Sequence, residues 1–269
     1  MPELDPKKSL QAVYARALAR ERTRAKLTQD QLGGHPAIMV SGKLIGHVEN
    51  CRRPPTIRLS TGLDKALDLE EFFESLYIHW ADEEGPPSAI WEYSELEHQA
   101  NSIKVYAQST ICGLLQNEDY AREIFKRAHR EERVGELVAA RIARQEILHR
   151  DDPPWLVVLI EETAIRRVVG DREVMRRQLA HLLTLAAEPN ITVLVVPSGA
   201  PVFPGGAFTL LGFPDSPDVA FVEAVGGHSQ IVDNRAQVRE LAVLYDRISS
   251  EALPVADSEK LIRGVLEDL

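Results

Sequence analysis

Apolar residues recur at helical spacing near the N-terminus of the chain. A first helix is predicted from residue 14 to residue 25, where small and apolar side chains share one face, namely Ala15, Leu18 and Ala19. Thr28 is followed three residues later by Gln31, the pairing in which each side chain accepts a hydrogen bond from a backbone N–H group at a helix start. A second helix is therefore expected to begin at Thr28.

A third helix is predicted after Ser41, which has a side chain typical of an N-terminal cap. Apolar residues occupy the positions expected to face inward: Leu44, Ile45 and Val48. Pro36 is expected to cut the second helix short, because proline is incompatible with a helix interior. Cys51 follows the third helix at a place where glycine would take the left-handed conformation at no steric cost.

Helical spacing continues through residues 56–80, which are expected to complete an N-terminal domain of residues 1–80. Residues 81–89 are acidic and rich in proline and glycine, a composition that cannot continue a helix and predicts a linker. Residues 90–269 then form a second domain.

The second domain mixes helical and strand-like patterns. Helices are predicted over residues 117–150, with Asn117 as the cap, and over residues 171–188, 234–252 and 257–269. Apolar runs at residues 155–160 and 191–196 predict buried strands, and residues 206–213 and 219–225 predict a hairpin. The expected fold is multidomain, an N-terminal all-α domain followed by a C-terminal mixed α/β domain with its strands covered by helices.

The N-terminal pattern resembles the XRE-type, lambda-repressor-like helix-turn-helix family. The matching residues, in family order, are Leu27, Thr28, Gln29, Leu32, Ser41, Ile45, Val48, Glu49, Arg53 and Pro54. Two departures are a link at residues 33–40 that is longer than usual and Cys51 in place of a capping glycine. The resemblance implies a helix-turn-helix fold whose third helix enters the major groove of double-stranded DNA.

DNA contacts are expected from both helices of this motif and from the turn after it. The predicted DNA-binding residues are Thr28, Gln29, Ser41, Gly42, Lys43, Gly46, His47, Asn50, Arg52 and Arg53. Gly42, Lys43, Gly46 and His47 are expected to face the groove, with Lys43 and His47 reading base edges. Arg52 and Arg53 are expected to contact phosphates, because they follow the recognition helix in a turn.

Residues 90–269 also resemble a known domain, the C-terminal domain of WhiJ-like, antitoxin-like XRE regulators. The matching segments are residues 93–97, 113–116, 119–121, 144–148, 161–167 and 208–211. The resemblance implies a transcription regulator with an interaction or sensing domain, in a family often encoded beside a small companion protein. It supplies no ligand.

Charge is distributed unevenly along the chain. The formal net charge is −10 at pH 7, which alone argues against nucleic acid. Residues 7–58, however, hold 11 Lys and Arg against three acidic residues, whereas residues 59–269 carry a net −16. A basic segment on an acidic body confines phosphate attraction to one part of the molecule. The alternative is that the arginines only form a solvated helix face: Arg16, Arg20, Arg22 and Arg24.

No catalytic constellation can be assembled, so the protein is not expected to be an enzyme. The motifs of nucleophilic serine, phosphate-loop, dinucleotide-binding and zinc-protease sites are missing from the sequence. The eight histidines include no pair four residues apart, so neither a metal nor a cofactor is expected. Glu161 and Glu162 are expected to begin a helix rather than to form a catalytic pair, because neighbouring strand residues point to opposite faces.

Other candidate features of the second domain have ordinary explanations. The Gly-rich residues 226–229 could bring a backbone close to a ligand, but a plain turn is favoured. Four residues on predicted strands could line a pocket, and core packing is favoured for the aromatic ones: Trp155, Phe208, Phe221 and Glu223. The two cysteines predict neither a disulfide framework nor a zinc site.

Two functions remain in contention. One is a sequence-specific transcription regulator whose second domain binds a partner protein or a small effector. The other is an antitoxin-like component of a toxin–antitoxin-like pair with autoregulatory DNA binding. The expected partners are double-stranded DNA, a second copy of the chain and a small companion protein, with no membrane and a cytoplasmic location. The dimer contact is expected from helices 171–188 and 234–252, because the N-terminal domain offers little apolar surface beyond its own core.

Overall fold

A computed structural model describes residues 9–84, 89–128, 130–224 and 229–269 of the chain. The chain divides into two compact units, Met1–Glu95 and Leu96–Leu269. The first is helical and the second is a mixed α/β sheet domain, which confirms the predicted fold class at this level. Within the described residues, no helix is both long and apolar enough to cross a bilayer.

The described residues of the first unit form α1 (Leu10–Arg24), α2 (Gln29–Gly33), α3 (Gly42–Glu49), α4 (Ile57–Leu67), α5 (Phe72–Glu84) and the start of α6 (Ala89–Gln99). The first begins four residues earlier than predicted, because Ser9 caps it by accepting a hydrogen bond from the Ala12 N–H at 3.4 Å. The second is short and ends at Gly33, before Pro36, as predicted.

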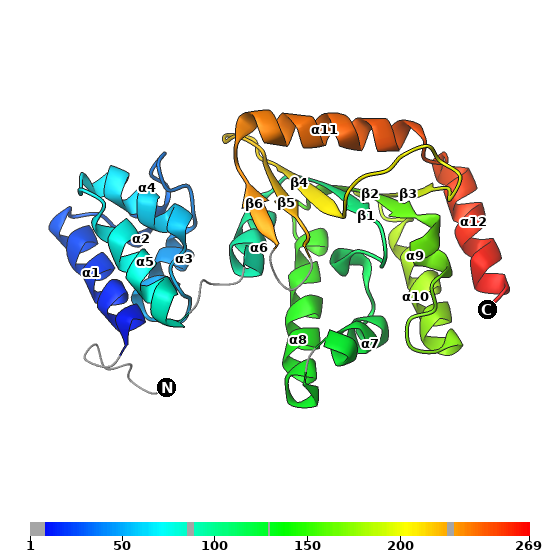
Figure 1. The fold of residues 1–269 in the computed structure, drawn as a ribbon, viewed down its shortest axis with the longest axis horizontal. Helices are drawn as coiled ribbons and strands as arrows, with labels where there is room; N and C mark the ends of the chain where they lie inside the picture. The colour runs from blue at the N-terminus through cyan, green and yellow to red at the C-terminus, as the bar shows by residue number, and fades with distance from the viewer. Residues whose placement is uncertain (1–8, 85–88, 129, 225–228) are drawn as a thin grey trace. The chain divides into compact units, whose positions relative to one another are not determined.

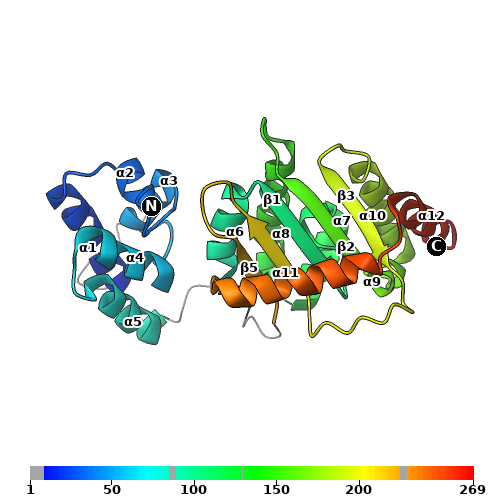
Figure 2. The same cartoon turned by 90° about the horizontal axis from the view of Figure 1, so that it is seen from above.

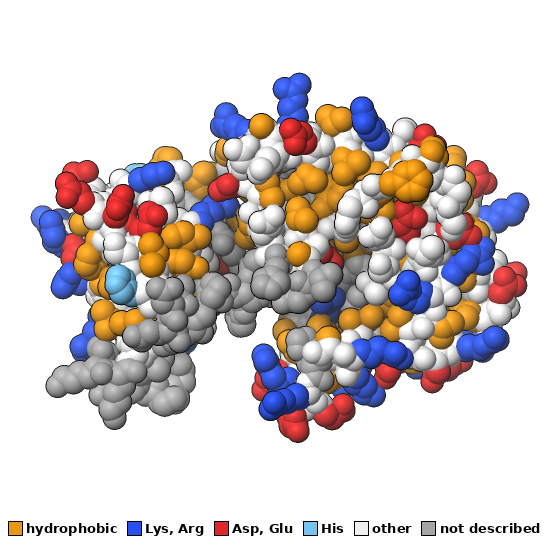
Figure 3. Space-filling view, in the orientation of Figure 1, with side chains coloured by type: hydrophobic (Ala, Val, Ile, Leu, Met, Phe, Trp, Pro, Cys, Tyr) orange, Lys and Arg blue, Asp and Glu red, His pale blue; other side chains and the backbone are white. Residues whose placement is uncertain are grey.

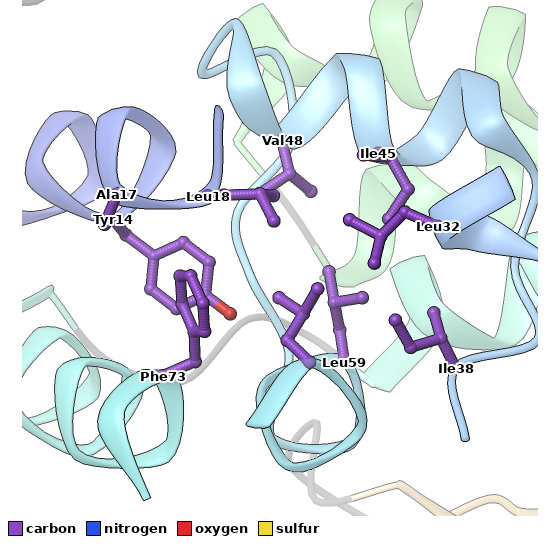
Figure 4. Close-up of a cluster of buried hydrophobic side chains, with 10 residues drawn as sticks. Tyr14, Ala17, Leu18, Leu32, Ile38, Ile45, Val48, Leu59 and Phe73 are labelled. Atoms are coloured by element: carbon purple, nitrogen blue, oxygen red, sulfur yellow. The ribbon is translucent and has the colours of Figure 1, made fainter. Parts of the chain in front are cut away.

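The core of the first unit gathers one to three buried apolar side chains from each of α1 to α5 (Figure 4). Ile38 joins it from the long link between α2 and α3, so the extra residues of that link are folded onto the core. Tyr14 packs against Phe73 with ring centroids 5.2 Å apart, and its buried hydroxyl lies 2.7 Å from Ser60 Oγ. The rings supply apolar area while the hydroxyl keeps a partner.

Asp64 sets the corner between α4 and α5. Its two carboxylate oxygens accept hydrogen bonds from the backbone N–H groups of Phe73 and Glu74 at 2.8 and 2.9 Å. These are donors of the first turn of α5, which have no partner within their own helix. The helix then runs on to Glu84, so the first four residues of the predicted linker 81–89 are helical. Residues 85–88 of that linker lie outside the described part of the chain.

Cys51, two residues after the end of α3, adopts the left-handed conformation with a φ of 53°. The Cys51 N–H donates to the Val48 carbonyl at 3.1 Å, and the Arg52 N–H donates to the His47 carbonyl at 2.8 Å. These two bonds form the turn that usually places glycine at this position. A residue with a Cβ atom is therefore held in a conformation that costs it free energy.

Replacing Cys51 by glycine is expected to raise the free energy of unfolding of the first unit by about 0.5–1 kcal/mol. Glycine removes the steric cost of the left-handed conformation, and part of that gain is lost because glycine gives up more backbone entropy on folding. Hydrogen exchange of the α3 amides in the full chain measures it. Cys51→Ala is the matched control, because it removes the thiol and keeps the Cβ atom, so it should give no gain. Equal protection of the α3 amides from exchange in Cys51→Gly and Cys51→Ala would show that the left-handed conformation of Cys51 costs no free energy.

The second unit is built on a six-stranded sheet with the order β3-β2-β1-β4-β5-β6. Its strands are β1 (Ser102–Ala107), β2 (Trp155–Glu161), β3 (Ile191–Val196), β4 (Phe208–Gly212), β5 (Val219–Val222) and β6 (Gln230–Val232). The first three strands are parallel, and the other three join them antiparallel, starting with the β1–β4 pair. The two predicted buried strands and the predicted hairpin are confirmed as β2, β3 and β4–β5.

Helices cover both faces of this sheet (Figures 1 and 2). One face packs against α11 (Arg235–Ser250) through a cluster that includes Tyr106, Phe208 and Tyr245. The opposite side carries α7 (Glu118–Ala128), α8 (Glu131–Arg144) and α10 (Arg172–Leu185). The remaining helices are α6 (Ala89–Gln99), α9 (Glu162–Arg166) and α12 (Val255–Glu267), with 3₁₀ turns at Gly113–Leu115 and Gln145–His149.

Three expectations for this unit are wrong. The predicted helix 117–150 is two helices, α7 and α8, followed by a 3₁₀ turn, although Asn117 does cap the first by accepting from the Tyr120 N–H at 2.9 Å. An unbroken helix of that length would span about 50 Å, whereas α7 and α8 pack against each other. The central strand β1 was not predicted. Trp155 is 65% exposed rather than packed in the core.

Apolar side chains also reach the surface of both units. The second unit exposes Phe203 almost completely, at 95%, and Figure 3 shows apolar side chains gathered below α11 among charged ones. The first unit exposes Ile57, Phe72 and Ile78, contrary to the expectation that it offers little apolar surface beyond its core. The large apolar residues of α10, one of the helices expected to make the dimer contact, are buried or partly buried within the second unit. This helix therefore has no exposed large apolar side chain.

Candidate nucleic-acid interface

The starts of α2 and α3 are capped as the sequence predicts. Thr28 and Gln31 bond reciprocally: Thr28 Oγ accepts from the Gln31 N–H at 3.1 Å, and Gln31 Oε1 accepts from the Thr28 N–H at 2.9 Å. Ser41 Oγ accepts from the Leu44 N–H at 3.2 Å. Ile45 and Val48 are buried and Leu44 is half-buried, so one face of α3 is held against the core. The opposite face is free to meet another molecule.

The two glycines of α3 face α2, not the outside. A Cβ atom at Gly42 would lie 1.9 Å from Asp30 Oδ1 and 2.6 Å from the Asp30 backbone nitrogen. One at Gly46 would lie 2.8 Å from Gln29 Oε1. The prediction that Gly42 and Gly46 face the groove is wrong, because Gly42 is buried where the two helices touch and Gly46 lies half-buried against Gln29 of α2. These glycines let α3 approach α2 closely.

A polar network joins α1, α2 and α3 beneath this contact. The Glu49 carboxylate accepts from Arg22 Nε at 2.5 Å and Nη2 at 3.1 Å, and from Gln29 Nε2 at 2.6 Å. The Glu49 and Arg22 side chains are only 6% and 18% exposed, and the carboxylate raises the pKa of Arg22. Gln29 was predicted to contact DNA, but its side-chain amide donates a hydrogen bond to Glu49 in this network. Arg22 is not part of a solvated face, and its pairing with Glu49 was missed because helix periodicity does not reveal contacts between helices.

The outward side of α3 carries Lys43, which is exposed, and His47, which is half-buried. Thr28, Ser41 and Asn50 are also exposed, but their side chains already make hydrogen bonds within the unit, Asn50 by donating to the Gly46 carbonyl at 2.7 Å. Polar side chains that cap helices can still accept or donate one further bond. The structure thus leaves Lys43 and His47 as the side chains of α3 best placed to read a groove.

The charges around His47 are mostly cationic, with the Glu95 carboxylate acting against them. Burial lowers its pKa first, and the charges of Arg53 and Lys43 lower it further. The imidazole is therefore neutral at neutral pH, with one ring nitrogen donating and the other accepting. A neutral ring can bond to a base edge, but it supplies no charge to a phosphate.

The two arginines after α3 differ in their environment. Arg52 is exposed. Arg53 is half-buried and its Nη1 lies 2.8 Å from Glu95 Oε1, the last residue of the first unit. Elsewhere in the unit, Arg20 and Arg24 both pair with Glu21 while remaining largely exposed. Arg52 is therefore the better placed of the pair for contact with a phosphate.

The second unit does not bring its predicted candidates together into a catalytic site. Glu161 accepts from the Tyr106 hydroxyl at 2.6 Å, while Glu162 begins α9, as predicted, and accepts from the Ser198 N–H at 3.0 Å. That bond lowers the pKa of Glu162. Phe208 and Phe221 are buried in the core. The predicted turn at residues 226–229 lies almost wholly outside the described residues, in which no cluster of three metal-ligating side chains occurs.

Comparison with known proteins assigns the second unit to a family. Residues 91–264 match the family model described as "Domain of unknown function (DUF5753)". No curated protein matches the chain, and no solved structure matches it. The matched residues make up more than half of the chain and include every strand of the sheet. The chain belongs to the DUF5753 family.

Proposed function

We propose that this protein is a sequence-specific DNA-binding transcription regulator. In this proposal the first unit is a helix-turn-helix in which α3 is the recognition helix. The observation that carries it is the division of α3 into an anchored face and an open one. Ile45 and Val48 enter the core and Gly42 contacts α2, while Lys43 and His47 remain outside. A helix held in this way can present side chains to base edges in the major groove.

The charges of residues 7–58 support the same function. Lys43, Arg52 and Arg16 are exposed cations, whereas most acidic residues lie in the rest of the chain. Attraction to phosphate is not specific for sequence, so it brings the unit to DNA while Lys43 and His47 discriminate among sites. The second unit would then control DNA binding through a partner protein or a small effector.

Lys43→Ala and His47→Ala are each expected to weaken binding to the cognate site by about 1–3 kcal/mol and binding to random DNA much less, because base contacts discriminate and phosphate contacts do not. Gel shift with the upstream region of the gene and with scrambled DNA of the same length measures both. Arg52→Ala is the control: it should weaken both complexes alike and reduce the salt slope by about 0.9. An equal loss on both DNAs for Lys43→Ala and His47→Ala would contradict base readout.

The alternative is an antitoxin-like component of a toxin–antitoxin-like pair. The exposed Trp155 and Phe203 of the second unit favour some contact with another protein, since large aromatic side chains are enriched in interfaces. Adding the neighbouring small protein to the gel shift separates the two functions. A complex that forms without DNA and alters autoregulatory binding supports the pair.

We also propose a homodimer, because one small recognition helix reads too few base pairs for useful specificity. Val243 of α11 is exposed on the second unit, and Ile78 of α5 on the first. We expect Val243→Asp to shift full-length protein toward the monomer in sedimentation equilibrium, because a buried unpaired charge opposes association. Ile78→Asp is the matched variant. If only Ile78→Asp dissociates the dimer, the first unit makes the contact.

A further inference from the structure

Arg141 of α8 is a half-buried cation whose partners are all neutral in the described part of the chain. Its Nη1 donates to Gln116 Oε1 at 2.9 Å, and its guanidinium carbon lies 4.9 Å from the centre of the Phe125 ring. The described residues place no carboxylate within ion-pair distance of it. Cations are seldom buried without an anion to compensate them, because desolvation is costly.

The segment around Arg141 is held in place before any ligand arrives. The guanidinium lies over Gly113, where a Cβ atom would come within 2.5 Å of Nη1. Gln116 Nε2 donates to the Ile111 carbonyl at 2.7 Å, and Gln145 Nε2 donates to the Gly113 and Gln116 carbonyls at 2.9 and 2.7 Å. Arg141 therefore has a fixed position beside a fixed loop. Preorganised donors of this kind bind with little loss of entropy.

The neighbouring carboxylates, Glu97 and Glu223, do not form an ion pair with Arg141. Arg144, one helical turn away, is paired in a fork with the fully buried Glu97. Burial raises the pKa of Cys112 to about 12, so its thiol is neutral. Burial and the charge of Arg144 lower the pKa of Arg141 to about 10, which still leaves it charged at neutral pH. Glu223 acts on Arg141 from beyond ion-pair distance and is exposed to water.

The sheet topology places this cluster where open α/β sheets bind ligands. The chain winds from β1 to β2 to β3 in one direction and then returns to the other side of β1 as β4. The strand order therefore reverses between β1 and β4. Gly113 follows the carboxyl end of β1, and Glu223 follows β5, whose Val222 pairs with Phe208 at the same edge. Ligands bind in such sheets at the carboxyl ends of the strands beside this reversal.

We propose that Arg141 anchors a binding site for a small anion that carries a carboxylate or phosphate group. The planar guanidinium binds either group through paired N–H donors, and the ligand places an anion in direct contact with it, which no described carboxylate does. The site lies within the second unit and is tested without DNA, so it stands or falls separately from the DNA-binding function. A regulator whose second unit holds such a site would respond to an acidic metabolite.

The test is calorimetric titration of full-length protein with sodium phosphate and with sodium succinate, each against sodium chloride at the same ionic strength. Saturable binding of at least one is expected, and which one binds distinguishes a phosphate from a carboxylate ligand. Arg141→Met should lower the affinity at least tenfold, and Gly113→Ala should also lower it by displacing the guanidinium. Arg177→Met is the matched control on α10, where the exposed Arg177 already pairs with Asp119, and it should bind as the parent protein does.

Phosphate could also bind the basic residues 7–58, so Arg52→Ala is measured in parallel. Affinity lost in Arg52→Ala and kept in Arg141→Met would overturn the proposal, as would no saturable binding of either anion. If circular dichroism shows that Arg141→Met is unfolded, the anion affinities of Gly113→Ala and Arg141→Lys are measured instead. Affinities equal to that of the parent protein in both variants would rule out the proposed site. Arg141→Lys keeps the charge but loses the paired donors, so its affinity should fall between those of the parent protein and Gly113→Ala.

Discussion

Replacing Glu49 by alanine is expected to destabilise the first unit by about 2–3 kcal/mol. Its carboxylate is the acceptor shared by Arg22 and Gln29. Its removal leaves Arg22 with only the Leu27 carbonyl as acceptor, at 2.9 Å, and leaves the Gln29 amide without this acceptor. Breaking a buried pair in this way usually costs more than the pair itself contributes. The 18% exposure of Arg22 lets some water return, which keeps the cost below that of a fully buried pair.

Hydrogen exchange of the full chain measures the loss of stability in Glu49→Ala separately for each helix. Amides of α1, α2 and α3 should exchange up to about a hundredfold faster, since each 1.4 kcal/mol is a factor of ten, while those of the second unit should be unchanged. Glu21→Ala is the control. Glu21 also pairs with two arginines, Arg20 and Arg24, but these are 68% and 75% exposed, so its loss should cost less than about 1 kcal/mol. Similar losses in both variants would show that the Glu49 network adds no more than a surface ion pair.

The second large effect is expected from Gly42→Ala, with a cost of about 2–3 kcal/mol to the packing of α2 against α3. The added methyl group would overlap the Asp30 backbone nitrogen and Cα, at 2.6 and 2.7 Å. A backbone cannot rotate away as a side chain can, so the helices must separate. The gain of about 1 kcal/mol in helix propensity is smaller than this cost. If α3 is the recognition helix, its displacement should also weaken DNA binding.

Two further glycine variants make this prediction specific. Gly46→Ala meets only the end of the Gln29 side chain, which can move if it gives up its bond to Glu49, so its net cost should be smaller than that of Gly42→Ala. Gly264→Ala lies on α12 with no atom nearby and should stabilise the second unit by about 0.5–1 kcal/mol. Thermal unfolding and hydrogen exchange measure the change in stability caused by each of the three variants, Gly42→Ala, Gly46→Ala and Gly264→Ala. If Gly42→Ala proved as well tolerated as Gly46→Ala, the tight approach of α3 to Asp30 would be contradicted.

The local signals in the sequence are the ones that the structure confirms. Thr28, Gln31 and Ser41 cap helices because their partners are backbone groups within one turn, and Asn117 does the same in the second unit. The apolar runs of β2 and β3 are buried as expected. Cys51 takes the conformation that the sequence places at the end of α3, because the turn geometry leaves no other choice. These features depend on neighbours in the chain.

Contacts between distant residues account for what the sequence could not show. The strand β1 carries Ser102 and Lys104 among its apolar residues, so no apolar run marks it, yet β2 and β4 make it central to the sheet. Helical spacing alone places Gly42 on the outward side of α3, and only the approach of Asp30 shows that it is buried. Arg141 lies near Gly113 and Gln116 because α8 folds back on the loop after β1. Periodicity reveals which face of an element is apolar, but burial and charge compensation depend on what packs against that face, and only the tertiary structure decides that.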